Sequence, residues 1–207
     1  MHKLFSGGWV GPAEVGGSLF VLLFSMNYYR SFLQWNAMRS DVKTATLSDP
    51  VLQLLTPMDC SIVMSAVVYG MLVAGSVYCR NKPDVFITAA QTLTLALWTR
   101  MLMIYLVPVK SPRGAIPLSS SIHETVGSAP SLVACTLLAV TRRHHCAWRW
   151  AFASFAMVSG LLGLAQKLQY TADLITTPSL VTLVASVVAA VRQTVGQITS
   201  KAKLKKL

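Results

Sequence analysis

The chain has 207 residues, of which 54% are hydrophobic and only 12% are charged. Soluble domains carry about 25% charged residues, and a domain of this size leaves roughly a third of its surface in water. The composition therefore excludes a soluble globular enzyme, a disordered chain and a disulfide-rich secreted module, and it indicates a multi-pass membrane protein.

The net charge is +11. Because the basic residues lie mostly at the ends of apolar runs, they fit membrane topology and anionic lipid better than nucleic acid, and no nucleic-acid partner is expected.

Six apolar runs predict an all-α bundle of six transmembrane helices. They cover residues 15–32, 60–79, 85–107, 130–140, 147–165 and 174–191. Continuous runs near 20 residues are typical of helices, whereas strands of a membrane barrel alternate over about ten residues. The run at 130–140 is short for a crossing, so it either begins earlier or lies behind other helices.

We expect one integral membrane domain over residues 1–207, with an N-terminal extension at 1–14 and a basic tail at 193–207. Six crossings put both termini on one side of the membrane. Eleven Lys and Arg residues then lie on the side of the termini. Six lie on the other side, namely Arg30, Arg39, Lys43, Lys110, Arg113 and Lys167. By the positive-inside rule, the termini face the cytoplasm or the mitochondrial matrix.

The cysteines and histidines give no metal motif. None of Cys60, Cys79, Cys135 and Cys146 forms a Cys-x-x-Cys pair, and buried free cysteines commonly act as small apolar residues. His144, His145 and Cys146 are adjacent, and adjacent residues rarely close a metal site without further ligands. We expect no metal site and no cofactor.

Three stretches carry a family resemblance. Residues 49–59 read Asp-Pro-Val-Leu-Gln-Leu-Leu-Thr-Pro-Met-Asp, and an apolar helix with Tyr69 and Gly70 follows them. Residues 100–108 read Arg-Met-Leu-Met-Ile-Tyr-Leu-Val-Pro. The stretch that follows, up to Leu118, contains Pro112, Gly114 and Pro117. Residues 170–173 read Tyr-Thr-Ala-Asp. In this order, over residues 49–191, the chain resembles the membrane lipid phosphatase and phosphotransferase superfamily, in particular its sphingomyelin-synthase-like branch.

The resemblance implies transfer of a phosphoryl or phosphocholine-type group. In that family a histidine attacks phosphorus, an aspartate four residues later orients it, and a histidine in a Ser-Gly-His motif protonates the leaving group. Here Gln169 stands at the nucleophile position and Asp173 at the aspartate position. A glutamine amide is neither basic nor nucleophilic, so the resemblance implies a pseudoenzyme.

The Ser-Gly-His motif is also absent, and two alignments remain open. One places Ala129, Pro130 and Ser131 at that position, so that Ser131, Gln169 and Asp173 are vestigial catalytic positions. The other uses Ser121, Ile122 and His123 and retains the second histidine. In both alignments the nucleophile is missing.

Arg100, Lys110 and Arg113 are candidate lipid-binding residues. Arg100 lies within an apolar run, where ionisable side chains usually face the bundle interior and pair. It either clamps a phosphate or forms an internal strut to Asp173 or Gln169. Lys110 and Arg113 follow the same run and either hold a headgroup or anchor the chain at the interface.

A membrane scaffold without chemistry is expected to bind partners or lipid. We expect an accessory subunit of a large complex, with the mitochondrial inner membrane (respiratory chain or ATP synthase) favoured. There the basic loops would face anionic phospholipid such as cardiolipin. The Lys-rich ending also fits an endoplasmic reticulum retrieval signal. Two alternatives remain: an active lipid phosphatase or headgroup transferase with a replaced nucleophile, and a lipid-binding or scrambling protein.

Overall fold

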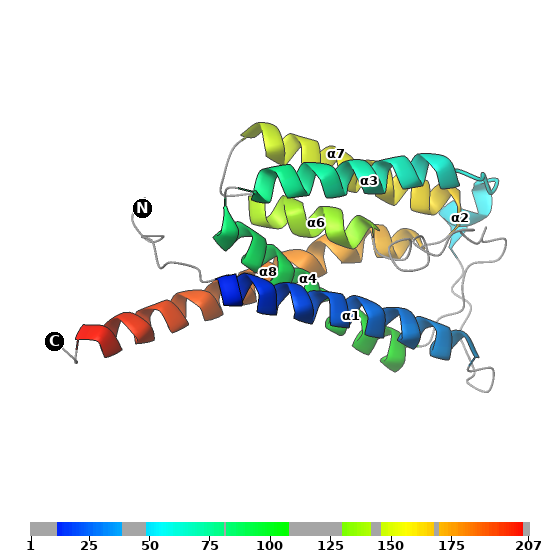
Figure 1. Ribbon diagram of the computed structural model, residues 1–207. Coiled ribbons are helices and arrows are strands. Elements are labelled where there is room, and N and C mark those ends of the chain that lie inside the picture. The colour runs from blue at the N-terminus through cyan, green and yellow to red at the C-terminus, as the bar shows by residue number, and fades with distance from the viewer. Residues whose placement is uncertain are drawn as a thin grey trace.

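The computed structural model describes the backbone of residues 12–38, 49–80, 82–107, 130–141, 146–167 and 170–204. These ranges hold seven helices and no strand (Figure 1). The helices are α1 (Pro12–Met38), α2 (Pro50–Leu54), α3 (Ser61–Cys79), α4 (Pro83–Leu106), α6 (Pro130–Thr141), α7 (Cys146–Ala165) and α8 (Thr171–Leu204). The all-α prediction is confirmed for this part of the chain.

Four helices are long and apolar enough to cross a membrane. The stretches that qualify are Ser61–Cys79, Pro83–Leu106, Ala147–Ala165 and Thr171–Ile198. These four fit an integral membrane protein, as expected from the composition. α1 has 27 residues, but Asn27 and Arg30 interrupt its apolar run, and it does not qualify. The prediction of six spans therefore remains a prediction for α1 and α6.

α6 is too short to cross a bilayer by itself. Its 12 residues rise about 18 Å, against about 30 Å of hydrocarbon. The first seven residues of α6, from Pro130 to Thr136, are buried. The helix packs against α7, α8 and α4, so its described part lies behind its neighbours, as one of the two alternatives predicts. The other alternative, an earlier start, concerns residues outside the described ranges.

Proline marks the start of four helices. Pro12, Pro50, Pro83 and Pro130 each open a helix, where the missing N–H is no loss because the first helical N–H groups have no partner within the helix. Asp84 follows Pro83 in the first turn of α4, and a carboxylate there interacts favourably with the positive end of the helix dipole.

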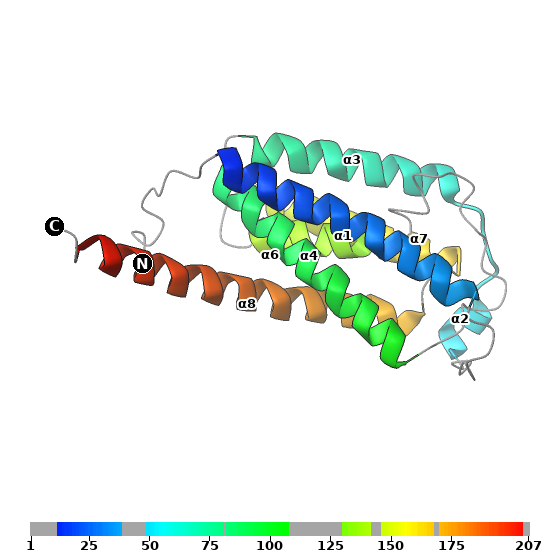
Figure 2. The same ribbon diagram turned by 60° about the horizontal axis from the view of Figure 1, so that its bottom comes forward.

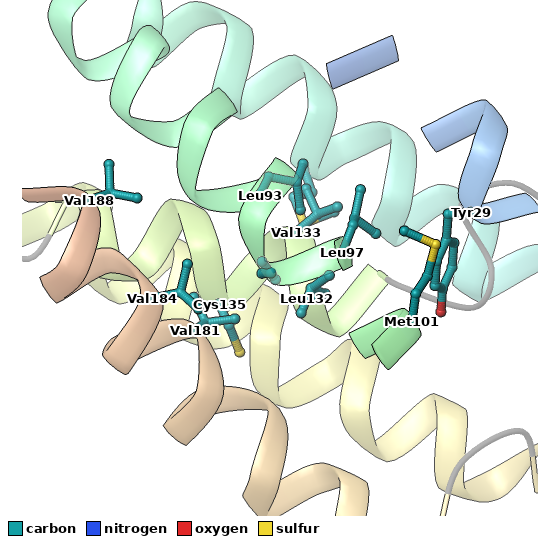
Figure 3. Close-up of a cluster of buried hydrophobic side chains, with 13 residues drawn as sticks. Tyr29, Leu93, Leu97, Met101, Leu132, Val133, Cys135, Val181, Val184 and Val188 are labelled. Carbon is teal, nitrogen blue, oxygen red and sulfur yellow. The ribbon is translucent and has the colours of Figure 1, made fainter. Parts of the chain in front are cut away.

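α4 lies at the centre of the bundle. α1 packs along it, α6 and α8 pack on it, and α7 joins α6 to α3. A cluster of buried apolar side chains fills the space where α1, α4, α6 and α8 meet (Figure 3). It includes Tyr29, Leu97, Met101, Leu132, Val133, Val181 and Val184. The indole N–H of Trp98 also donates to Ser25 Oγ at 3.1 Å, which ties α4 to α1.

Apart from the short α2, successive helices run in opposite directions (Figures 1 and 2). α2 and the first residues of α3, α6 and α8 lie at one end of the bundle, which we call the α2 end. α1, α4 and α7 begin at the other end, which we call the Arg192 end, and α8 extends beyond it. The described start of α1 and end of α8 therefore lie toward the same end.

Candidate functional site

Asp49 joins the first turns of two helices at the α2 end. Its Oδ1 accepts hydrogen bonds from Val51 N and Leu52 N, both at 3.2 Å, which caps α2. Its Oδ2 accepts from Thr171 N at 2.7 Å, and Thr171 Oγ1 donates to Oδ1 at 3.1 Å. The first N–H groups of a helix have no partner within it. One carboxylate thus serves α2 and α8 across 122 positions of sequence.

These contacts keep Asp49 ionised. The hydrogen bond from Thr171 N lowers the pKa of Asp49 below its ordinary value, and those from Leu52 N and Val51 N lower it further, while desolvation opposes them. The side chain is 8% exposed. A buried carboxylate is stable there because four donors and two positive helix ends surround it.

Gln166 makes a second link between the same regions. It is fully buried and lies directly after α7. With its amide oriented so that the oxygen faces the start of α3, Oε1 accepts from Ser61 N at 2.8 Å and from Cys60 N at 3.1 Å. Nearby, Met58 N donates to Ala165 O at 3.0 Å. The segment before α3 is therefore fixed to the connection between α7 and α8.

We call Asp49, Ser61, Gln166 and Thr171 the polar cluster. It joins the first and third stretches of the family resemblance, residues 49–59 and 170–173, in space. Its polar groups bind to one another and to backbone N–H groups. Asp59 behaves in the same way: its Oδ1 accepts from Ser61 N at 3.0 Å, and the hydrogen bonds from Ser61 lower its pKa.

The structure places three of the sequence-predicted site residues. Asp173 lies in the first turn of α8, and its Oδ2 accepts from Tyr170 N at 3.3 Å. Ser131 is buried in the first turn of α6. Arg100 is half-buried on α4, toward the α2 end. Among the described residues, Arg100 has no ion pair or hydrogen bond with Asp173.

The other candidates lie outside the described residues. They are Lys110, Arg113, His123, Gln169 and the pair His144 and His145. The structure therefore does not describe the surroundings of Gln169.

The polar cluster holds helix starts together, and its hydroxyl groups donate to carboxylates, Thr171 Oγ1 to Asp49 and Ser61 Oγ to Asp59. Asp49 accepts four hydrogen bonds, and Asp173 accepts one from the backbone at the start of its own helix. The described residues contain no group of three His, Cys, Asp or Glu that could hold a metal ion. Cys60, Cys79 and Cys135 are free thiols.

Sequence reasoning missed Asp49 and Gln166. Asp-Pro at 49–50 is a local signal for a helix start, so the cap on α2 could have been predicted. Nothing local marks Thr171 as a second partner, because that contact depends on how α8 is packed. No residue pattern around Gln166 indicates that its side chain would contact the start of α3.

Comparison of the chain with protein-family models, curated proteins and solved structures found no match.

Proposed function

We propose that this protein is a non-catalytic accessory subunit of a larger membrane complex, built on a six-span lipid-phosphatase-like bundle. The observation that carries the proposal is the length of α8. Its 34 residues rise about 51 Å, against about 30 Å of hydrocarbon. α8 is therefore longer than a crossing requires, and it extends past the other helices at the Arg192 end (Figure 2).

Arg192 marks the point where α8 leaves the membrane. Its guanidinium donates to Asp84 O at 3.0 Å and to Thr88 Oγ1, and it lies 3.8 Å from the Asp84 carboxylate. These contacts fix α8 to the first turns of α4. Charged groups at such positions are typical of the membrane interface, so residues after 192 face water or protein.

The projecting part of α8 carries apolar side chains that this chain leaves exposed. Val195 is 56% exposed and Ile198 is 63% exposed, and residues three apart lie on one face of a helix. Gln193, Thr194 and Gln197 make the rest of this segment polar. Burial of one such apolar side chain contributes about 1.5–3 kcal/mol. A helix of another subunit packed on this face would provide that burial.

The double variant Val195→Gln, Ile198→Gln tests the partner face. We expect it to lose most of the proteins that copurify with the wild type in mild detergent, with no change in helix content. The control Gln193→Asn changes the polar face of the same segment and should copurify like the wild type. Equal copurification by all three proteins would contradict a partner on this face.

The absence of catalysis is proposed from Gln169 and supported by the polar cluster. An amide cannot attack phosphorus, and the described carboxylates of this region hold helix starts. Purified protein should release no phosphate or headgroup from phosphatidate, ceramide-based substrates or phosphatidylcholine. Turnover that Asp173→Ala abolishes would support the alternative of an enzyme with a replaced nucleophile.

For the compartment, we propose the mitochondrial inner membrane, with the basic ends of the chain facing the matrix. Eleven basic residues are assigned to that side, and they suit a membrane rich in anionic lipid. Localisation of the tagged chain checks this, and residence in the endoplasmic reticulum would contradict it.

A further inference from the structure

We propose that a groove at the Arg192 end binds one anionic phospholipid, with an acyl chain along α8 and the phosphate at Arg149. The groove has a volume of about 430 Å³ and lies between α4, α6, α7 and α8. Small-molecule sites in proteins measure about 300–1,000 Å³. The inference rests on the chain being embedded in a membrane and does not depend on the proposed partner or on the loss of catalysis.

Small side chains make the groove. On α8 its wall includes Thr182, Ala185, Ser186 and Ala189, which follow one another at helical spacing along one face. α6 is short, and its residues 137–140 are only partly buried. The wall of the groove is mainly apolar, as an acyl chain requires.

The length of the groove matches one leaflet. Along α8 it runs from Pro178 to Ala189, which is about 17 Å at 1.5 Å per residue. Half of the hydrocarbon core is about 15 Å. A partner helix that crosses the membrane would need about twice that length, so the dimensions favour a lipid chain that enters from the interface.

The mouth of the groove carries positive charge. Arg149 lies in the first turn of α7 and lines the groove together with Trp150. Arg149 is exposed, and within the described residues no carboxylate pairs with it. Asp84, the described carboxylate in the first turn of α4, is already paired with Arg192.

The chemistry of the mouth selects a phosphate. A guanidinium binds phosphate oxygens through two parallel N–H groups, and Trp150, which is 69% exposed, is typical of an interfacial anchor. A headgroup with net negative charge is favoured over a zwitterionic one, because the mouth offers no described free carboxylate for an ammonium group.

The test uses the full-length protein in nanodiscs of phosphatidylcholine that contain a small fraction of spin-labelled phosphatidylglycerol or spin-labelled phosphatidylcholine. The motionally restricted fraction of each lipid gives the selectivity for phosphatidylglycerol. We expect Arg149→Gln to reduce that selectivity about fivefold to tenfold, the loss of one charge-assisted contact. Ala185→Leu, which fills the groove and leaves the charge unchanged, should reduce it to a similar extent.

Arg80→Gln is the matched control. Arg80 is an exposed basic residue that follows α3 at the same end of the bundle, and it does not line the groove. Its selectivity should equal that of the wild type. An equal loss in Arg80→Gln and Arg149→Gln, or full selectivity in Ala185→Leu, would show attraction by surface charge alone and overturn the proposal. Circular dichroism of each variant confirms that the bundle is intact.

Discussion

At the scale of single residues, Asp49 is the side chain on which most of the α2 end depends. Its four accepted hydrogen bonds come from α2 and α8, two helices that are far apart in sequence. A neutral substitute keeps the size of the side chain but loses the negative charge that two positive helix ends stabilise. The stability of this end should therefore depend on pH through this carboxyl group.

The direction of that pH dependence follows from the lowered pKa of Asp49. A carboxyl group whose pKa is lower in the folded state than in the unfolded state stabilises the fold at pH values above its unfolded-state pKa, which is about 3.9 for aspartate. This contribution is lost as the pH falls through the folded-state pKa. We expect the melting temperature of the detergent-solubilised protein to fall by several degrees as the pH drops below about 4. Asp49→Asn should melt lower at neutral pH and lose less on acidification; a wild-type-like acid response of this variant would contradict the assignment.

Gln166 allows a second test at this scale. Gln166→Leu keeps a similar volume but removes the acceptor of Cys60 N, whereas Ser61 N keeps its hydrogen bond to Asp59 Oδ1. An unsatisfied buried donor costs about 1–3 kcal/mol, so thermal unfolding should show a clear loss of stability. Gln193→Leu, on an exposed part of α8, should stay within about 0.5 kcal/mol of the wild type. Equal stability of the two variants would mean that the amide does not hold α3.

At the scale of helices, the apolar runs predicted where the main helices lie, because burial in lipid or in the bundle needs long apolar stretches. The run at 85–107 corresponds to Pro83–Leu106, and the run at 147–165 to Cys146–Ala165. The last run ends at 191 in the sequence, whereas α8 continues to Leu204. Arg192, Gln193, Thr194 and Gln197 interrupt the apolar sequence after Val191, so hydropathy could not show that the helix continues.

Gly160 of α7 lies close to the Leu174 side chain of α8. A Cβ at Gly160 of α7 would clash with the Leu174 side chain of α8, whereas a Cβ at Gly16 of α1 would meet no atom within 4 Å. Gly160→Leu should therefore destabilise the bundle by about 1–3 kcal/mol, the typical cost of overpacking. Gly16→Leu should cause no comparable loss in the same thermal unfolding measurement. A stable Gly160→Leu protein would mean that α7 and α8 are not in close contact.

At the scale of the whole molecule, the two ends of α3 lie at opposite ends of the bundle, so a crossing by α3 would place them on opposite faces of the membrane. Cys60 precedes α3 at the α2 end, and Cys79 closes it at the Arg192 end. Both side chains are partly exposed. In variants that keep one of these cysteines, a membrane-impermeant maleimide added to sealed vesicles should label Cys60 and Cys79 from opposite sides. Labelling of both from the same side would exclude α3 as a span.

The sequence predicted the membrane bundle but not how the candidate site is built. Composition and apolar runs are sums over many residues, so single contacts do not alter them. The link between Asp49 and Thr171, by contrast, depends on the packing of helices distant in sequence. Lys167, which follows α7 with a φ of 55°, occupies a backbone conformation that glycine usually takes, and hence the turn before α8 carries no glycine signal.

We propose that this bundle binds other subunits. The most direct measurement is the mass of the particle in which the full-length protein leaves its own membrane in a mild detergent. We expect a complex far larger than the 22.5 kDa chain, with the same partner proteins recovered each time. A monodisperse particle that contains this chain alone, with detergent and lipid, would contradict the account.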